Sequence, residues 1–135
     1  MLQQIPIAMV EPAWALAKPL LQKVVPHAMG YWGIDELHQD VSTGRRNLLL
    51  EVTGVEITAA LVVTYQKQLD HVSVWVSALG GDGCVNGRSI EDLASLLKSN
   101  GATHIEAAMR PSVVRLLNQH GLGFKEKYRV YEAMI

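Results

Sequence analysis

Three β-rich runs in the middle of the chain limit what it can fold into more than any other feature. They cover residues 48–52, 56–65 and 71–79. Connections as short as those between them join antiparallel strands, because a parallel crossover needs about a dozen residues or more. Valine alternates with serine or tryptophan along the third run, which ends at the glycine-rich stretch 80–83. This part of the chain predicts an antiparallel meander that leaves the sheet through a glycine turn.

The N-terminal part adds a strand and two helices. A strand is expected over 4–10, with Pro6 suited to a sheet edge, where a missing N–H costs no ladder bond. The helix that follows is expected to be kinked or split at Pro19. Apolar residues at helical spacing then predict a helix over 34–43, ended by Gly44.

The C-terminal part repeats a helix–strand alternation. Ser89 is the expected N-cap of a third helix, and 103–108 is the expected next strand. Pro111 starts a fourth helix, and 124–135 returns as the last strand. The predicted order is β-α-α-β-β-β-α-β-α-β in a single domain over 1–135. The fold class is α/β (α+β), with a mixed, mostly antiparallel sheet flanked by helices.

Composition excludes several functional classes. The formal net charge is −1 and the basic residues are scattered, so nucleic acid is a poor expectation. The apolar runs are strand-sized, so no membrane span is expected. The five histidines and Cys84 lack metal-ligand spacing, so no metal is expected. The start of the chain lacks the features of a signal peptide, which favours a cytoplasmic protein.

The order of elements, with its glycine turn, resembles the GNAT superfamily of N-acetyltransferases over essentially the whole chain. In that superfamily the turn carries a Gln/Arg-x-x-Gly-x-Gly/Ala signature that binds the pyrophosphate of acetyl-CoA. Residues 78–83 read Ala-Leu-Gly-Gly-Asp-Gly, which keeps Gly-x-Gly and places Ala78 where Gln or Arg is usual. Residues 114–124 are similar to the end of the family's fourth helix and the start of its last strand, with Leu117 near the usual tyrosine.

A narrower resemblance is to short GNAT-like proteins of tailed phages and prophages. Four motifs carry it in order: Leu79–Gly83, Gly101–Glu106, Arg110 and Arg115–Phe124. This resemblance implies a fold more than a function. It implies a location in the host cytoplasm, or in the virion for a structural protein of the phage.

The glycine turn could bind the anionic end of acetyl-CoA. A helix start has unpaired N–H groups and about half a positive charge, and glycines let a phosphate approach the backbone. The resemblance also implies that the pantetheine amides pair with the backbone of the fourth strand. The cofactor-binding candidates are Val76, Ala78, Gly80, Gly81, Gly83 and Arg88. The alternative is a β-to-α turn without a ligand, which the carboxylate of Asp82 favours.

Acyl transfer to an amine also needs a base and an acid. A lysine-like amine has a pKa of about 10.4, so its deprotonation at neutral pH costs about 4–5 kcal/mol. The catalytic candidates are Tyr128, His71 and Glu51, with Glu106, Tyr131 and Cys84 as further ones. Each has a structural alternative: a surface histidine, paired carboxylates, tyrosines that pack on a sheet, and a small buried cysteine.

Two functions of different classes remain open. The first is an acyl-CoA-dependent N-acyltransferase acting on an amine. The second is a non-catalytic GNAT-like protein, such as a virion component or a binder of a host protein, because fold alone does not define function. The resemblance also implies a homodimer through the last strands, for which the segment 128–135 is suited.

Overall fold

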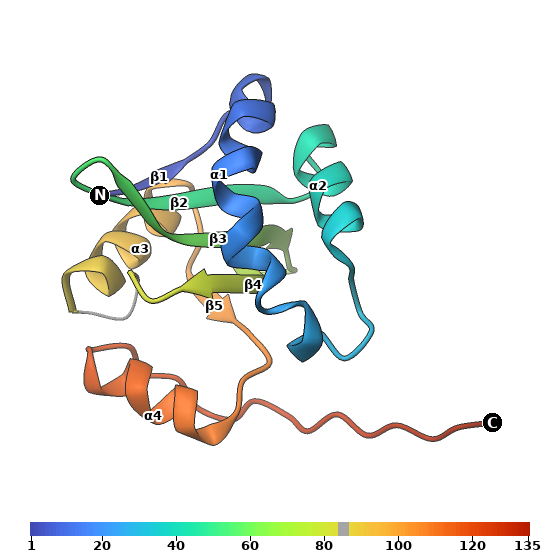
Figure 1. Cartoon of the computed structure of the whole chain (residues 1–135). Coiled ribbons are helices and arrows are strands. Elements are labelled where there is room, and N and C mark those ends of the chain that lie inside the picture. The colour runs from blue at the N-terminus through green and yellow to red at the C-terminus, as the bar shows by residue number, and fades with distance from the viewer. Residues whose placement is uncertain (84–86) are drawn as a thin grey trace.

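Three long strands form the centre of the sheet in the computed structural model, which describes residues 1–83 and 87–135. They are β2 (Asn47–Thr53), β3 (Glu56–Lys67) and β4 (Val72–Gly81), each antiparallel to the next. β1 (Leu2–Gln4) pairs antiparallel with β2, and β5 (His104–Glu106) pairs parallel with β4. The five-stranded order β1-β2-β3-β4-β5 confirms the predicted mixed, mostly antiparallel sheet (Figure 1).

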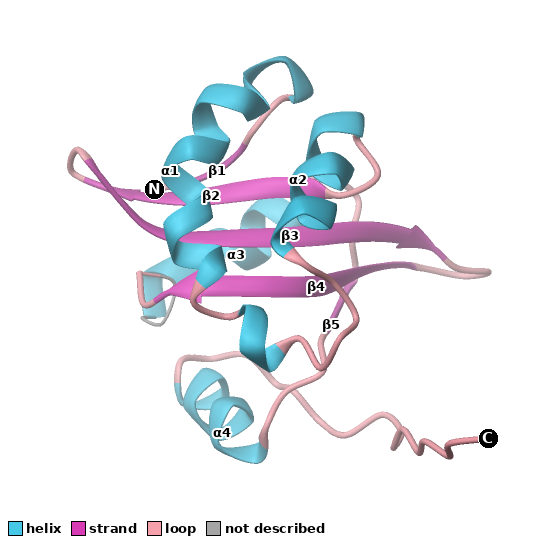
Figure 2. Ribbon diagram, turned by 45° about the vertical axis from the view of Figure 1, so that its right-hand side comes forward, coloured by secondary structure: helices cyan, strands magenta, loops and turns pink. Residues whose placement is uncertain are grey.

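Helices cover both faces of this sheet. α1 (Val10–Gln22) and α2 (Ile34–Thr43) lie on one face, and α3 (Gly87–Ser99) lies on the other (Figure 2). The short 3-10 helices η1 (Ile7–Met9) and η2 (Val25–His27) flank α1, and α4 (Pro111–Gln119) follows β5. The sheet is therefore the middle layer between two helical layers.

Each face of the sheet has its own apolar core. Along β3, Ala60 and Val62 pack in the α1–α2 core, whereas Ala59, Leu61 and Val63 pack in the α3 core. A strand buried on both faces is continuously apolar and does not alternate. This explains why the sequence of β3 lacks the polar alternation of a half-exposed strand.

The second and fourth helices agree best with the sequence. α2 has the predicted bounds, and Gly44 follows it with a φ of 81°, a left-handed conformation that favours glycine. A Cβ at Gly44 would also lie 2.8 Å from Cδ1 of Ile7. α4 begins at Pro111, after an extended Arg110.

The N-terminal strand lies earlier than predicted: β1 covers Leu2–Gln4, and the expected strand over 4–10 is wrong beyond its first residue, because η1 and the start of α1 occupy 7–10. The Ile5 N–H still donates to the Leu48 carbonyl over 2.8 Å. Pro6 has no N–H with which to continue the ladder, and the chain turns into η1. Pro19 lies inside α1, which runs unbroken to Gln22, so Pro19 does not split the helix, and the alternative of a kink there stays a prediction.

The third helix begins earlier than predicted. α3 starts at Gly87, so Ser89 lies in its first turn and is not the N-cap. Ser89 is buried, and its Oγ donates to Oε1 of Glu51 on β2 over 3.4 Å. A serine at this position satisfies the pattern of a cap, but its side chain bonds to the sheet.

The predicted last strand is absent. Asn118 holds the start of segment 124–135 through two hydrogen bonds to the backbone of Phe124, of 2.8 and 2.9 Å, but the segment pairs with no described strand. An extended segment becomes a strand only beside a neighbour. From Thr103 to Ile135 no residue is buried. The final β of the predicted order is therefore wrong for this isolated chain.

Candidate functional site

β4 carries one extra residue opposite β3. Val76 pairs with Val63 and Ala78 pairs with Val62, so Ser77 between them has no partner in the register. Such a β-bulge bends its strand and increases the local twist. The bulge therefore changes the direction of β4 in the middle of the sheet.

β4 and β5 separate at this bend. Their parallel pairing covers Ser73–Trp75 with His104–Glu106, after which β5 ends and β4 continues to Gly81. We call the space beside Val76–Gly81 on the β5 side the wedge. Within the described residues, no strand pairs with this edge of β4. Its backbone polar groups are thus positioned to bind an extended ligand with amide groups.

A tryptophan side chain from a distant part of the sequence holds the bulge in place. The indole N–H of Trp32, in the segment before α2, donates to the Ser77 carbonyl over 3.1 Å. Trp32 is half-buried and packs against the α1–α2 core. A bulge gives no signal in the sequence, so the sequence does not reveal that Trp32 bonds to it.

The glycines at the end of β4 have a packing cause. A Cβ at Gly80 would lie 2.3 Å from the Leu20 carbonyl oxygen, and one at Gly81 would lie 2.2 Å from that of Thr58. Gly81 also has a φ of 86°, and the Gly83 N–H donates to the Thr58 carbonyl over 3.2 Å. The close approach that requires these glycines is made by the protein's own backbone. Their role in cofactor binding stays a prediction.

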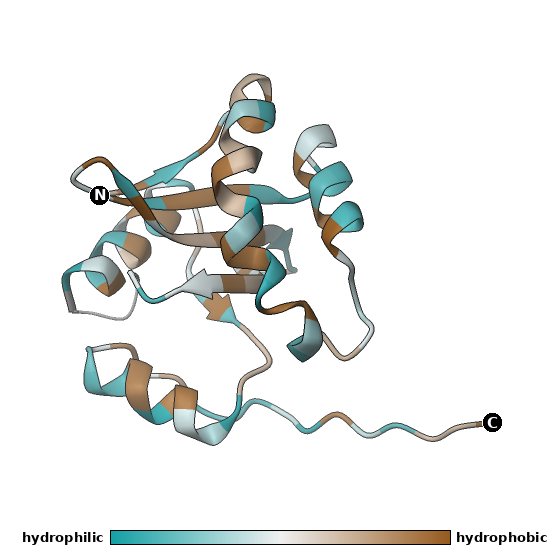
Figure 3. Ribbon diagram, viewed as in Figure 1, coloured by the Kyte–Doolittle hydropathy of each residue, from teal (hydrophilic) through white to brown (hydrophobic). Residues whose placement is uncertain are grey.

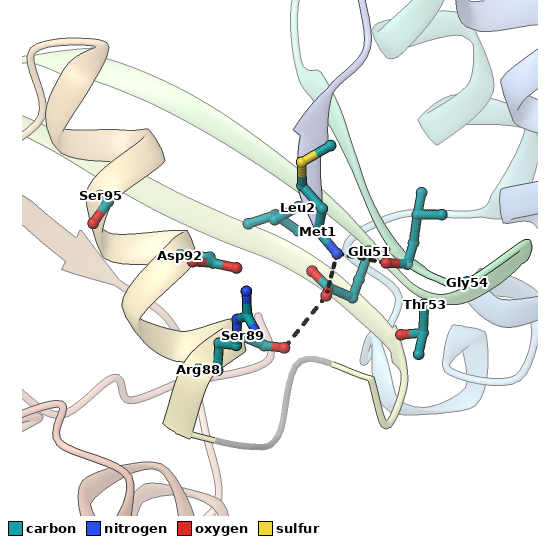
Figure 4. Close-up of a pocket in the computed structure, with 10 residues that line it drawn as sticks. Met1, Leu2, Glu51, Thr53, Gly54, Arg88, Ser89, Asp92 and Ser95 are labelled. Atoms are coloured by element: carbon teal, nitrogen blue, oxygen red, sulfur yellow. Dashed lines mark hydrogen bonds and ion pairs between the residues drawn. The ribbon is translucent and has the colours of Figure 1, made fainter.

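A polar pocket of about 620 Å³ lies between the start of α3 and the β1–β2 end of the sheet (Figure 4). Glu51 is at its base, with a side chain only 6% exposed. Its Oε1 lies 3.0 Å from the Met1 amino group and accepts the Ser89 hydrogen bond. Its Oε2 has no hydrogen-bond partner among the described residues. A carboxylate here stabilises the start of a helix and repels a diphosphate.

Register separates Glu51 from the middle of the wedge. Glu51 pairs with Ala59, and Ala59 pairs with Gly81, so Glu51 is level with the glycine corner. At about 3.3 Å per residue, Val76 lies roughly 16 Å further along β4. The structure therefore places Glu51 beside the glycine corner and away from the middle of the wedge. Arg88 and Asp92 line the same pocket, and Arg88 is exposed.

His71 lies at the opposite end of β4. Its Nδ1 is 2.6 Å from Oδ1 of Asp70, and its ring centroid is 4.4 Å from that of His104. The hydrogen bond with His71 lowers the pKa of the Asp70 carboxyl. His71 precedes the paired part of β4, whereas the wedge begins after it, so this candidate base also lies outside the wedge.

A larger cavity, of about 1,580 Å³, follows the outer edge of β5. We call it the C-terminal groove; α3, β5, α4 and the segment 122–130 form its walls, and Leu97, Ile105, Val114 and Tyr128 are among its lining residues. His71 and Trp75 line it as well, so the groove brings together two of the three catalytic candidates, His71 and Tyr128. Glu106 pairs with Lys127 at its rim, over 2.8 Å, and raises the pKa of Lys127.

The remaining residues singled out in the sequence, as far as the structure describes them, do not contribute to either pocket. Tyr131 is 85% exposed on the C-terminal segment, and Asp82 is exposed beside the glycine corner. Cys84 lies outside the described residues. Within 1–83 and 87–135, no group of three or more His, Cys, Asp or Glu side chains could hold a metal ion. None of the helices described there has the length and apolar character to cross a bilayer.

Comparison with solved structures shows the fold. An aminoglycoside acetyltransferase from an uncultured soil metagenomic sample, in complex with sisomicin, matches with a TM-score of 0.71 and 9% identity, over 100% of this chain and 95% of that one. A possible acetyltransferase from Clostridium difficile 630 matches with a TM-score of 0.60 and 10% identity, over 100% and 97%. A transcriptional regulator from Bacillus halodurans C-125 matches with 0.62 and 14%, over 100% and 99%.

Sequence comparison adds nothing to this. No family model matches the chain, and no curated protein matches it. At 9%, 10% and 14% identity, these structural matches show a shared fold and nothing finer.

Proposed function

We propose that the protein is an acyl-CoA-dependent N-acyltransferase that transfers an acetyl group to an amine. The observation that carries this proposal is the wedge, where the pairing of β4 with β5 ends at Trp75, just before the bulge at Ser77. A strand edge left open beside a bulge, inside a fold shared with acetyltransferases, is suited to an extended cofactor arm that carries amides.

The open edge of β4 fits the pantetheine arm of acetyl-CoA better than the glycine corner fits its diphosphate. Backbone groups of Val76–Ala78 lie along the wedge, where cofactor amides would pair with them as a strand does. At the corner the Gly83 N–H is already bound and the Glu51 carboxylate lies close to the start of α3. Arg88 is the cation that would offset this repulsion.

The protein would contribute to the reaction mainly by positioning the two reactants. When bound, acetyl-CoA supplies an activated thioester, and alignment of that thioester with an amine can lower the barrier by several kcal/mol. Neither Glu51 nor His71 lies in the wedge, so neither is placed to accept the proton of the amine. Tyr128, which lines the C-terminal groove, is the candidate acid for the leaving thiolate.

A thermal shift tests the proposal. Acetyl-CoA at about 100 times its Kd should stabilise the protein by about 2.7 kcal/mol, which raises Tm by roughly 10 °C. Ala108→Trp should abolish the shift, because Ala108 lies two residues past the end of β5, at the mouth of the C-terminal groove, and a large ring there is expected to reach into the wedge. Ala15→Trp, at an equally exposed alanine on α1, is the matched control and should keep the shift.

Turnover is measured beside the thermal shift, as release of free CoA thiol in the presence of small amines and peptides. Absence of any shift with acetyl-CoA and with longer acyl-CoAs contradicts the proposal. A shift without release of thiol from any amine favours the second function, a non-catalytic GNAT-like binder. That alternative is supported by Ala78 and Leu117, which replace the signature residue and the usual tyrosine, and by the position of Glu51 and His71 outside the wedge.

Trp32 is expected to set the affinity for the cofactor through Ser77. Trp32→Phe keeps an aromatic ring and removes the indole N–H, so the hydrogen bond that fixes the Ser77 carbonyl is lost. The loss of one hydrogen bond, about 1 kcal/mol, should weaken acetyl-CoA binding by about fivefold in calorimetric titration. Tyr31→Phe removes a polar group from the neighbouring aromatic residue, which is 69% exposed, and should leave the Kd unchanged. An unchanged Kd in Trp32→Phe would exclude this positioning role.

A further inference from the structure

The C-terminal groove begins where the wedge begins. Trp75 is the last residue of β4 that pairs with β5, and Ala107 is the first residue beyond β5. Both residues line the groove, whereas the wedge starts at Val76, the next residue of β4. The two spaces therefore adjoin at the point where the strands separate.

The groove has an apolar interior and a charged margin. Leu97 of α3, Ile105 of β5 and Val114 of α4 are among the apolar residues of its walls. Figure 3 shows hydrophobic residues on β5 and along α4, two of the elements that form these walls. Lys98 and Arg115 also line the groove, and both are exposed. Apolar walls with a few polar groups are typical of sites for small organic ligands.

The position of the groove relates it to the acyl group of the donor. With its phosphate end at the glycine corner, a pantetheine arm along Val76–Ala78 would place its thioester near Trp75. The acyl group would then continue along β4 in the direction of the groove. An acetyl group occupies very little of this space, because the groove has a volume of about 1,580 Å³ and a methyl group needs roughly as much room as one water molecule, about 30 Å³.

We propose that the C-terminal groove binds the acyl chain of the donor, and that the preferred donor is a medium-chain acyl-CoA of about ten carbons. The length follows from the edge of β5: from Ala107 back to Thr103, both of which line the groove, the chain covers roughly 13 Å at about 3.3 Å per residue. An extended carbon chain with bonds of about 1.5 Å advances roughly 1.25 Å per carbon.

This inference rests on the proposed function, because it needs the pantetheine arm in the wedge, and it extends the acyl group beyond acetyl. The transfer itself is unchanged. The amine nitrogen bonds to the thioester carbonyl carbon, the carbon–sulfur bond breaks, and the amine proton passes to the thiolate. The products are an amide with the longer acyl chain and the free thiol of CoA.

Calorimetric titration of the full chain with CoA and with acetyl-, hexanoyl-, decanoyl- and hexadecanoyl-CoA, below their micelle concentrations, tests the inference. Complete burial of a methylene strengthens binding about fourfold. Because the groove is open on one side, we expect a smaller gain per carbon, and a Kd for decanoyl-CoA at least about 100-fold below that for acetyl-CoA. Hexadecanoyl-CoA should gain little more, since its last carbons would extend past Thr103.

Equal Kd values for CoA, acetyl-CoA and decanoyl-CoA overturn the inference and leave the proposed function intact. Absence of binding by every member of the series contradicts the proposed function as well. A Kd that keeps falling through hexadecanoyl-CoA overturns the assigned length. Free decanoate that binds as tightly as decanoyl-CoA also overturns the inference, because the chain would then bind apolar surface without being positioned by the wedge.

Two neighbouring valines of α4 provide a matched pair of variants. Val114 lines the groove, whereas Val113 is also half-buried but lies outside the groove's described walls. Val114→Asp places a carboxylate beside the acyl chain, so decanoyl-CoA should bind this variant no more than about threefold tighter than acetyl-CoA. Val113→Asp should keep the wild-type preference. With both variants shown to be folded by circular dichroism, an equal effect of the two on this preference places the acyl chain elsewhere and overturns the inference.

Discussion

Replacing Gly80 with alanine is expected to lower the free energy of unfolding by about 3 kcal/mol or more. The added Cβ would lie 2.3 Å from the Leu20 carbonyl oxygen and 2.6 Å from its carbon, and both are backbone atoms of α1. Backbone atoms inside a helix cannot move aside as the end of a side chain can. Either α1 or β4 must shift, and both belong to the core that contains Ala78 and Leu21.

Chemical denaturation monitored by circular dichroism measures this loss, and Tm should fall by roughly 10 °C. Gly123→Ala is the matched control, because a Cβ there meets nothing within 4 Å and the backbone φ is not in the left-handed range. Its stability should change by less than about 0.5 kcal/mol. If Gly80→Ala is as stable as the control, α1 and the glycine corner of β4 are in looser contact than described. The corner would then have space for a phosphate.

The same result bears on the origin of the glycine signature. Gly-x-Gly after a strand and before a helix indicates a phosphate site, but it also satisfies a strand that crosses close to a helix. Sequence cannot separate the two, because both require an absent Cβ. A large stability loss in Gly80→Ala without CoA would show that packing alone is enough to require glycine at this position.

Local signals predicted the elements whose ends depend on nearby residues. The bounds of α2 follow from its apolar spacing and from Gly44, and the start of α4 follows from Pro111, so both were readable from the sequence. Ser89 shows the limit of such signals. It has the residue type of an N-cap, yet its Oγ bonds to Glu51, which is distant in sequence.

Features that depend on partners distant in the sequence could not be predicted from it. The bulge at Ser77 and its bond from Trp32 arise from the register of β3 and β4, which leaves no mark on either residue. The segment 124–135 has the composition of a strand, but a strand also needs an edge to pair with. The sequence predicted a strand from this composition and could not supply the neighbour that a strand needs.

Glu51→Ala is expected to destabilise the protein by about 2–3 kcal/mol, because it removes the acceptor of a buried bond and leaves a cavity. The carboxylate connects the start of α3, through Ser89, to the N-terminal amino group beside β1. Glu51→Gln keeps the volume and one acceptor oxygen, so its loss should be about 1 kcal/mol. Asp92→Ala, in the same pocket but only half-buried, is the control and should change stability by less than about 0.5 kcal/mol.

Kinetics separates this structural role from a catalytic one. Because Glu51 is level with Gly81 and not with Val76, the turnover number of folded Glu51→Gln should equal that of the wild type below both melting temperatures. A general base contributes about 10²–10⁴ in rate, so its removal would be unmistakable. A Glu51→Gln protein that stays as stable as the wild type but loses turnover by such a factor would make Glu51 the base. It would also require the acyl group to lie at the glycine end of β4, which reverses the direction of the cofactor in the wedge.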